Sequence, residues 1–156
     1  MQTKPLTNLS LMLRCISLNV KGLNLPEKRS QVLSSLSKHK AHFIFLQETH
    51  FRSDAIPKLS NHIYRSAFHA TNPDAKRKGI SILISKHANF HLSDSLIDPA
   101  GRFIFLKGTY AAKPITLANI YCPNEHQVTF FRSTCDLLAS FQEGLVLLGG
   151  GTSTFP

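Results

Sequence analysis

The sequence predicts an α/β fold of mixed β-sheets with helices on their outer faces. Short apolar runs typical of strands recur along the chain, at 13–18, 42–47, 79–85 and 145–148. Apolar residues at helical spacing occupy about 27–39 and 127–141, whereas only turns separate 89–98, 102–110 and 115–121. Strands joined by tight turns pair antiparallel and strands joined through a helix can pair in parallel, so both kinds of pairing are expected.

The first part of the chain alternates strand, helix and strand after a loose tail. Residues 1–11 are polar and irregular, and they are expected to form a flexible tail before the strand at 13–18. The next loop ends at Pro26, a residue suited to the first turn of a helix, and the helix is expected at about 27–39. The run HFIFLQ at 42–47 is typical of a strand covered on both faces.

The rest of the chain is mostly extended. After QETHFRSD, residues 54–60 are expected to form a short helix, and TNPDAKRK at 71–78 an exposed basic loop. LVLL at 145–148 is expected to be another strand covered on both faces. The other expected strands are 63–67, 79–85, 89–98, 102–110 and 115–121, the last three antiparallel around turns at 98–101 and 112–114.

Size and charge restrict the class of protein. The chain has 156 residues, which suits one domain, and its 42% hydrophobic content favours a globular fold over disorder. Lys and Arg total 18 against 9 acidic residues, a net charge of +9. Such an excess favours a polyanion such as nucleic acid, or an anionic membrane surface, and its alternative meaning is solubility alone.

The remaining counts exclude several classes. No apolar run reaches the roughly 18 residues of a membrane span, and the N-terminus has no clear signal-peptide cleavage site. The three cysteines form no CxxC pair, which fits a reducing compartment better than a disulfide framework or a zinc site. Cys15 and Cys122 lie in apolar strand segments, where buried thiols are expected.

Polar side chains follow three predicted strands directly. Asn19 ends the first strand, Glu48 follows the second, and Tyr121 ends a later one with Asn124 just beyond. Strand ends hold side chains rigidly while leaving them open to a cleft. Glu48 follows a buried run, so its carboxylate needs water, a partner or a cation such as Mg²⁺, with Asn19 as an amide neighbour. The alternative is a solvated acid at a strand end.

Four segments carry a family resemblance. SLNVKGL, FLQETH, KGISILIS and NIYCPN occur in this order at the predicted strands. Together they resemble the endonuclease/exonuclease/phosphatase family, with the closest similarity to LINE-type retrotransposon endonuclease domains, whose relatives include exonuclease III and apurinic endonucleases. The resemblance covers about residues 12–151 and implies a two-layer β-sandwich flanked by helices. It also implies metal-dependent hydrolysis of a DNA phosphodiester by in-line attack of water, in an intracellular and nuclear setting.

The resemblance assigns roles to individual residues. Glu48 matches the family's metal-binding glutamate, and Asn19 matches the asparagine of its first strand, expected at the metal and in catalysis. Tyr121 matches the tyrosine that contacts the scissile phosphate, and Asn124 falls on a nearby polar position. The expected cofactor is Mg²⁺, with Mn²⁺ as an alternative. For Tyr121 the competing interpretation is a core aromatic residue whose hydroxyl group is hydrogen-bonded.

The match fails at the end of the chain. The family has Asp-x-Asn after a strand like 145–148, whereas Gly151 and Ser153 stand at these positions here. The family's closing Asp-His pair would lie beyond Pro156, and none of the eight histidines can be assigned to it. We therefore expect 12–156 to be a partial domain, truncated on its C-terminal side, with an exposed apolar face and little or no activity. A gene-model artefact of a longer active protein is the alternative.

Basic residues supply the expected DNA contacts. Lys21 and Arg52 lie in loops beside the proposed metal site, and Lys76, Arg77 and Lys78 form a basic run, whose commoner meaning is a solvated surface. Two alternative functions remain: a repair-type exonuclease III or apurinic endonuclease, and a non-catalytic DNA-binding remnant. A lipid or inositol phosphatase is less favoured because no segment is directed to a membrane. The sequence indicates no oligomeric state.

Overall fold

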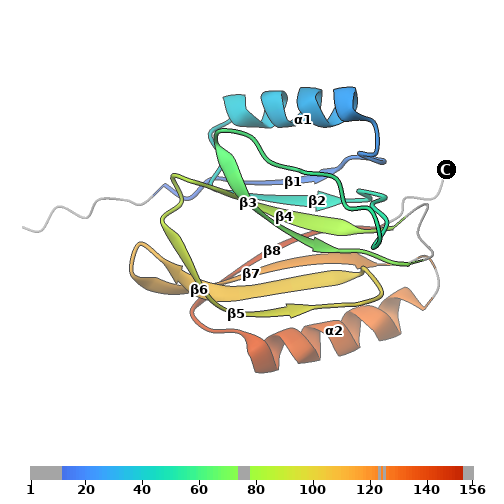
Figure 1. Cartoon of the computed structure of the whole chain (residues 1–156). Helices are drawn as coiled ribbons and strands as arrows, with labels where there is room; N and C mark the ends of the chain where they lie inside the picture. Colours follow the sequence, from blue (N-terminus) through green and yellow to red (C-terminus); the bar gives the residue numbers. More distant parts are fainter. Residues whose placement is uncertain (1–11, 74–77, 123, 125, 153–156) are drawn as a thin grey trace, which may run out of the picture.

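Two four-stranded sheets pack face to face, with one helix outside each sheet (Figure 1). This computed structural model describes residues 12–73, 78–122, 124 and 126–152, so the expected tail at 1–11 lies outside the described residues. The elements are β1 (Cys15–Asn19), α1 (Pro26–Lys38), β2 (Phe43–Gln47), β3 (Tyr64–Ala70), β4 (Ile80–Ser85), β5 (Phe90–Ile97), β6 (Phe103–Tyr110), β7 (Lys113–Cys122), α2 (Gln127–Phe141) and β8 (Leu145–Thr152). The predicted class, an α/β sandwich of mixed sheets flanked by helices, is confirmed.

Each sheet contains one parallel pair of strands. The first sheet has the order β1-β2-β4-β3 and the second β5-β6-β7-β8. The parallel pairs are β1 with β2 and β7 with β8, and each is connected through a helix, α1 or α2. The other neighbours pair antiparallel. This arrangement follows from connection geometry, because a parallel pair needs a crossover and a tight turn cannot supply one.

Burial follows the position of each strand in its sheet. Every residue of β2 and β4, the two central strands of the first sheet, is buried, as their continuous apolar sequences indicate. Phe43, Ile82 and Leu117 belong to the core between the sheets. Leu33 and Leu36 of α1 pack on the outer face of the first sheet. A smaller cluster on the α2 side of the second sheet contains Phe105 and Leu138.

A buried pair of amides links the two sheets. Asn119 of β7 is fully buried, and its Nδ2 donates to the carbonyl oxygens of Leu46 at 3.0 Å and Ser81 at 2.9 Å, on β2 and β4. Its Oδ1 accepts from Gln47 Nε2 at 2.9 Å, and this nitrogen also lies 3.1 Å from Ser17 Oγ. We call this set the Asn119–Gln47 clasp. It satisfies polar groups that would otherwise be costly to bury, and it fixes the second sheet against the first.

One predicted helix is wrong. Residues 54–60 contain no helix; a turn closed by an isolated bridge between Arg52 and Ala55 is followed by irregular chain. Pro57 lies inside this segment, lacks an N–H donor and disfavours helical backbone in the residue before it. Leu59 is its one buried residue, so a helix here would have no apolar stripe to bury.

The strands at the open edges are more exposed than their sequences suggest. β8 was expected to be covered on both faces, but Leu145 and Leu148 are 57% and 53% exposed. Cys15 on β1 is exposed rather than buried, whereas Cys122 is buried as expected. Both differences arise because β1 and β8 are edge strands, which an apolar sequence alone does not distinguish from central ones.

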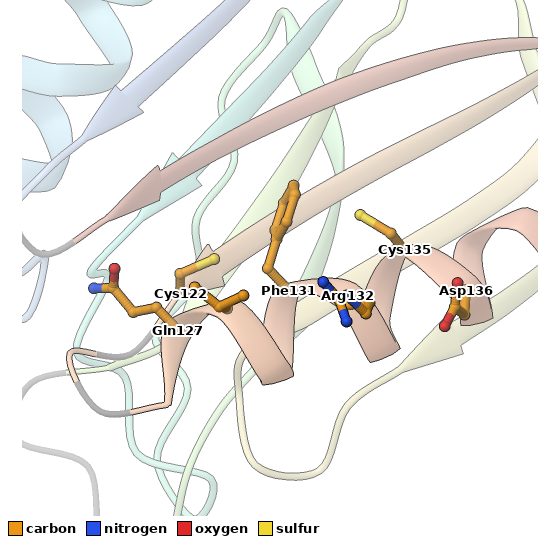
Figure 2. A pocket seen from close by; sticks show the side chains of 7 residues that line it. Cys122, Gln127, Phe131, Arg132, Cys135 and Asp136 are labelled. Atoms are coloured by element: carbon orange, nitrogen blue, oxygen red, sulfur yellow. The ribbon is translucent and has the colours of Figure 1, made fainter.

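An apolar surface also continues along α2. Figure 2 shows Cys122, Phe131 and Cys135 around a cavity of about 570 Å³ on this helix. Phe131 is 43% exposed and lines a second cavity with Leu148 of β8, and Val128 is 73% exposed, so apolar side chains of α2 add to the uncovered apolar area of β8. Among the described residues, no helix is long and apolar enough to cross a membrane.

Replacement of Asn119 by alanine tests the clasp. Asn119→Ala removes two donors and one acceptor from a site without water access, so the free energy of unfolding should fall by about 3 kcal/mol. Gln31→Ala, which removes an exposed amide from α1, should change it by less than about 0.5 kcal/mol. Urea denaturation measures both values. Equal effects of the two substitutions would contradict a stabilising role for the clasp.

His69 makes stability depend on pH. It is a half-buried residue of β3; its Nδ1 lies 2.7 Å from Ser81 Oγ, and its ring packs edge-on to Phe51 at 5.6 Å. Burial lowers the pKa of His69 from 6.5 to about 4. Between these values the unfolded chain binds the proton better, so stability is highest above pH 6.5 and falls as the pH falls toward 4.

The expected loss over this pH range is about 3 kcal/mol at most. His69→Gln keeps a hydrogen-bonding group near Ser81 but does not titrate, so its unfolding free energy should vary less with pH. His91→Gln, at an exposed position of β5, should retain the wild-type pH dependence. Thermal unfolding across the range distinguishes these outcomes, and an unchanged profile for His69→Gln would assign the effect to other groups.

Candidate active site

Three loops are joined by backbone hydrogen bonds at one end of the first sheet. The loop after β1 bonds to the loop after β2, with Val20 N donating to Gln47 O at 3.0 Å and Gly22 N to Glu48 O at 2.7 Å. The loop after β2 then bonds to the segment before β4, where Thr49 N donates to Gly79 O at 3.0 Å. These bonds extend the pairing of the sheet beyond its strands and make this end rigid.

Glu48 is held in an unusual backbone conformation. Its φ is 55°, and His50, two residues later, has a φ of 60°. Residues other than glycine adopt the left-handed region at some cost, which the backbone bonds of the loop offset here. A Cβ at Gly22 would lie 2.9 Å from His50 Nδ1, so only glycine fits where the loop approaches this ring. The loop turns the Glu48 carboxylate out of the buried strand that precedes it.

Glu48 and Tyr121 meet across the two sheets. The Tyr121 hydroxyl group at the end of β7 donates to Glu48 Oε1 at 3.1 Å, although the residues are far apart in sequence. The side chain of Glu48 is 18% exposed, and Tyr121 is 6% exposed. Tyr121 N also donates to Arg102 O at 2.7 Å, which fixes the end of the strand. Two of the residues selected from the sequence therefore form one site.

His50 is a member of the site that sequence reasoning missed. Its Nε2 lies 3.8 Å from Glu48 Oε2, and its side chain is 20% exposed. It belongs to the same short loop as Glu48, and that proximity in sequence is the signal that could have identified it. Glu48 is thus flanked by a phenol on one oxygen and an imidazole on the other.

The two asparagines occupy different positions relative to Glu48. Asn19 is paired with Gln47 in the register of β1 and β2, so it lies beside the strand residue that precedes Glu48. Its Oδ1 accepts from Lys21 N at 3.0 Å and thereby shapes the loop after β1. Asn124 lies past the end of β7 and is exposed. Catalytic roles for Asn19 and Asn124 stay predictions.

The predicted DNA-binding residues differ in the contacts that they make within the protein. Lys21 is exposed beside the site, and Lys78 O accepts from His50 N at 2.9 Å in the loop junction. Arg52 makes a two-point contact with Asp54, at 3.0 and 2.9 Å, and these hydrogen bonds lower the pKa of Asp54. A DNA phosphate would compete with Asp54 for this guanidinium group. Lys76 and Arg77 lie outside the described residues.

Position 151 borders the site. Gly151 pairs with Tyr121 in the register of β7 and β8, and a Cβ there would lie 3.4 Å from Gln47 Cγ, an ordinary contact. A Cβ at Gly149 would instead lie 2.4 Å from Phe45 Cγ, inside the core. Position 151 can therefore accept a side chain and position 149 cannot. Ser153 lies outside the described residues.

The side chains at this site are compatible with Mg²⁺ only as an ion held by few protein ligands. The described residues contain no group of three His, Cys, Asp or Glu side chains placed to hold a metal. Mg²⁺ is commonly bound through one or two carboxylates, with water and substrate phosphate completing its octahedron. Glu48 would supply one carboxylate, and Asn19, whose Oδ1 keeps one lone pair after bonding to Lys21 N, would supply an amide oxygen. The residues fit such a lightly coordinated ion, with Glu48 as its main ligand.

Comparison with known proteins identifies solved structures with a similar fold. The sequence matches no protein-family model. Among solved structures, an AP endonuclease from Archaeoglobus fulgidus is similar over 89% of this chain, with a TM-score of 0.65 and 18% identity. A humanized D. rerio TDP2 is similar over 88%, with a TM-score of 0.66 and 20% identity. The endonuclease domain of TRAS1, a telomere-specific non-LTR retrotransposon, is similar over 89%, with a TM-score of 0.61 and 15% identity.

The chain corresponds to part of these proteins. It spans 56% of the A. fulgidus chain, 61% of the D. rerio chain and 58% of the TRAS1 chain. The similarity extends over nearly nine-tenths of this chain. On this basis, the chain shares its fold with these AP endonuclease, TDP2 and TRAS1 endonuclease structures.

Proposed function

We propose that this chain is a metal-dependent DNA phosphodiesterase of the endonuclease/exonuclease/phosphatase type, derived from a retrotransposon endonuclease and weakly active. The hydrogen bond between Tyr121 and Glu48 is the observation that carries the proposal. It places a carboxylate and a phenol at one point between the ends of β2 and β7, beside loops that contain basic residues. A site that hydrolyses a phosphodiester needs charge neutralisation and hydrogen-bond donors at the phosphate oxygens.

Each residue has a defined task in this proposal. Glu48 holds the cation, and the Tyr121 hydroxyl group donates to an oxygen of the scissile phosphate when substrate replaces its present partner. Asn19 supplies an amide oxygen on the metal side, and Asn124 braces the phosphate. When bound, Mg²⁺ supplies positive charge that offsets the negative charge developing on the phosphate. His50 Nε2 lies 3.8 Å from the other Glu48 carboxylate oxygen, and a protonated imidazole there adds positive charge beside it.

DNA is the proposed substrate for two reasons. The net charge of +9 favours a polyanion, and Lys21 provides an exposed cation beside the site. D. rerio TDP2, a structural neighbour at 19% identity, has been solved in complex with a single-strand DNA product. An intracellular and nuclear location is part of the proposal, because it brings the chain to DNA.

The second candidate is a DNA-binding protein without catalysis, and Gly151 favours it. No acceptor side chain stands at this position, which faces Gln47 next to Glu48. Loss of a group that positions or activates water costs about 10²–10⁴-fold in rate. Binding of DNA without metal-dependent cleavage would support this second function, and cleavage of an abasic duplex alone would favour a repair-type activity.

Replacement of Glu48 tests the catalytic proposal. Glu48→Gln keeps the shape of the side chain but removes its charge, so Mg²⁺-dependent nicking of supercoiled plasmid under enzyme excess should fall about 10²-fold or more. Titration with Mn²⁺ should show weakened binding in the same variant. Glu27→Gln, which removes an exposed carboxylate from the first turn of α1, serves as the charge-matched control. Nicking that persists in Glu48→Gln would exclude this site.

Restoration of a side chain at position 151 tests the explanation for weak activity. Gly151→Asp places a carboxylate where a Cβ has room, so nicking should rise at least about tenfold. Gly151→Ala fills the same space without an acceptor and should leave the rate unchanged. Both proteins should keep the wild-type circular dichroism spectrum. Equal rates for the two variants would show that the missing carboxylate is not the limiting defect.

A further inference from the structure

Two cavities flank α1 and share one residue, Ser37. The first, of about 450 Å³, follows one face of the helix and is closed on the other side by the chain before β3. The α1 residues that line this cavity recur about every three or four positions, as expected for one face of a helix. The residues that line it are Pro26, Arg29, Ser30, Leu33, Ser34 and Ser37 of α1, and Lys58, Ser60, Asn61 and His62 opposite.

The second cavity lies at the end of the first sheet that is remote from Glu48. It has a volume of about 550 Å³, and its polar lining includes Arg14, Lys40, His42 and His87. Strands rise about 3.3 Å per residue, so His42, which lines this cavity directly before β2, is about 20 Å along the strand from Glu48 at the other end. The cavity is therefore separate from the candidate active site.

The permanently charged side chains that line the two cavities are all positive. Their lining contains four permanent cations, Arg14, Arg29, Lys40 and Lys58, and no acidic side chain among the described residues. Arg29 NH1 donates to Leu23 O and Asn24 O at 2.9 and 2.8 Å, so part of its guanidinium group is already hydrogen-bonded to the protein. Arg14, Lys40 and Lys58 are exposed and can reach a ligand. Hydroxyl groups of Ser34 and other serines supply neutral donors between them.

The two cavities together follow the full length of α1. This helix returns the chain from the end of β1, beside the candidate active site, to the start of β2 at the remote cavity (Figure 1). Its near end is tied to the site loops, because Asn24 Nδ2 donates to His50 O at 2.9 Å. Its 13 residues span about 20 Å. We call this surface, defined by the two cavities, the α1 track.

Its length and charge match a nucleic-acid strand. One strand of a DNA duplex carries a phosphate about every 3.4 Å of helix axis, so a duplex segment as long as the α1 track has about six phosphates on that strand. Lysine, arginine and serine side chains are the groups that bind phosphate oxygens without reading sequence. The negative end of the α1 dipole faces the remote cavity and opposes an anion there, but Lys40 lies at this end and offsets it.

We propose that the α1 track is a second binding surface for the phosphate backbone of the substrate strand, leading from the candidate active site to the far end of the first sheet. The inference depends on the proposed function only for the choice of DNA as the polyanion. It adds a contact surface on the helix side of the first sheet, away from the Glu48–Tyr121 pair. Binding there requires neither the metal nor cleavage.

Substitution of the two lysines tests the proposal. Fluorescence anisotropy with a labelled oligothymidine about 20 nucleotides long, in EDTA, gives affinities between about 50 and 200 mM salt. Lys40→Gln and Lys58→Gln should each weaken binding several-fold and reduce the slope of log K against log salt by about 0.7. Arg132→Gln removes one charge from the exposed face of α2, over the other sheet, and should leave the slope unchanged.

The alternative outcomes are distinct. Equal weakening by Lys40→Gln, Lys58→Gln and Arg132→Gln would show a response to total charge and overturn the α1 track. Equal affinity for vesicles containing phosphatidylserine, lost in the same lysine variants, would assign the surface to a membrane and overturn the nucleic-acid proposal. Nicking of supercoiled plasmid by the wild-type protein in Mg²⁺ is measured separately. Absence of cleavage with a normal lysine effect would therefore refute the proposed function while leaving the α1 track in place.

Discussion

The buried contact between Asn119 and Gln47 is the constraint on which the site depends. Asn119 belongs to the second sheet, yet it bonds to carbonyl groups of two strands in the first. Gln47 donates the remaining bond to Asn119 and stands directly before Glu48 in the chain, and Tyr121 follows Asn119 by two residues. The clasp thus fixes the relative position of the two strand ends that carry the carboxylate and the phenol. A purely apolar contact would allow the sheets to slide, because dispersion has little directionality.

Apolar burial and hydrogen bonds stabilise different parts of this fold. The continuous apolar sequences of β2 and β4 supply the burial that drives assembly, and all their residues are buried. The hydrogen bonds among the loops after β1, after β2 and before β4 then hold Glu48 at a positive φ. The strain of that conformation is concentrated where a carboxylate must leave a buried strand and reach solvent. The two helices lie on opposite faces of the sandwich, so the exposed apolar residues of α2 are on the side opposite α1.

Several features of the site were predictable from single residues and their positions. Glu48 and Tyr121 were selected because each ends an apolar strand, and strand ends of an α/β sheet gather at its edges. Their direct contact, the proximity of His50 and the engagement of Arg52 by Asp54 were not predictable. These depend on side-chain directions in loops whose φ angles are unusual, and periodicity contains no information about such angles. The helix expected at 54–60 is absent because Pro57 disfavours helical backbone there and Leu59 alone provides no apolar stripe to pack.

The sequence by itself determined the order of strands and helices, the mixed pairing of the sheets and the excess of positive charge. These follow from local patterns: apolar periodicity, turn residues and composition. Only the tertiary structure decided which apolar strands are central and which are edges, and so why β8 is exposed while β4 is buried. It also decided where the charge gathers, because Arg14, Lys40 and Lys58 come from separate segments that meet around α1. The burial of a side chain and the electrostatic field around it depend on the residues that surround it in space. The sequence pattern directly specifies only the neighbours along the chain.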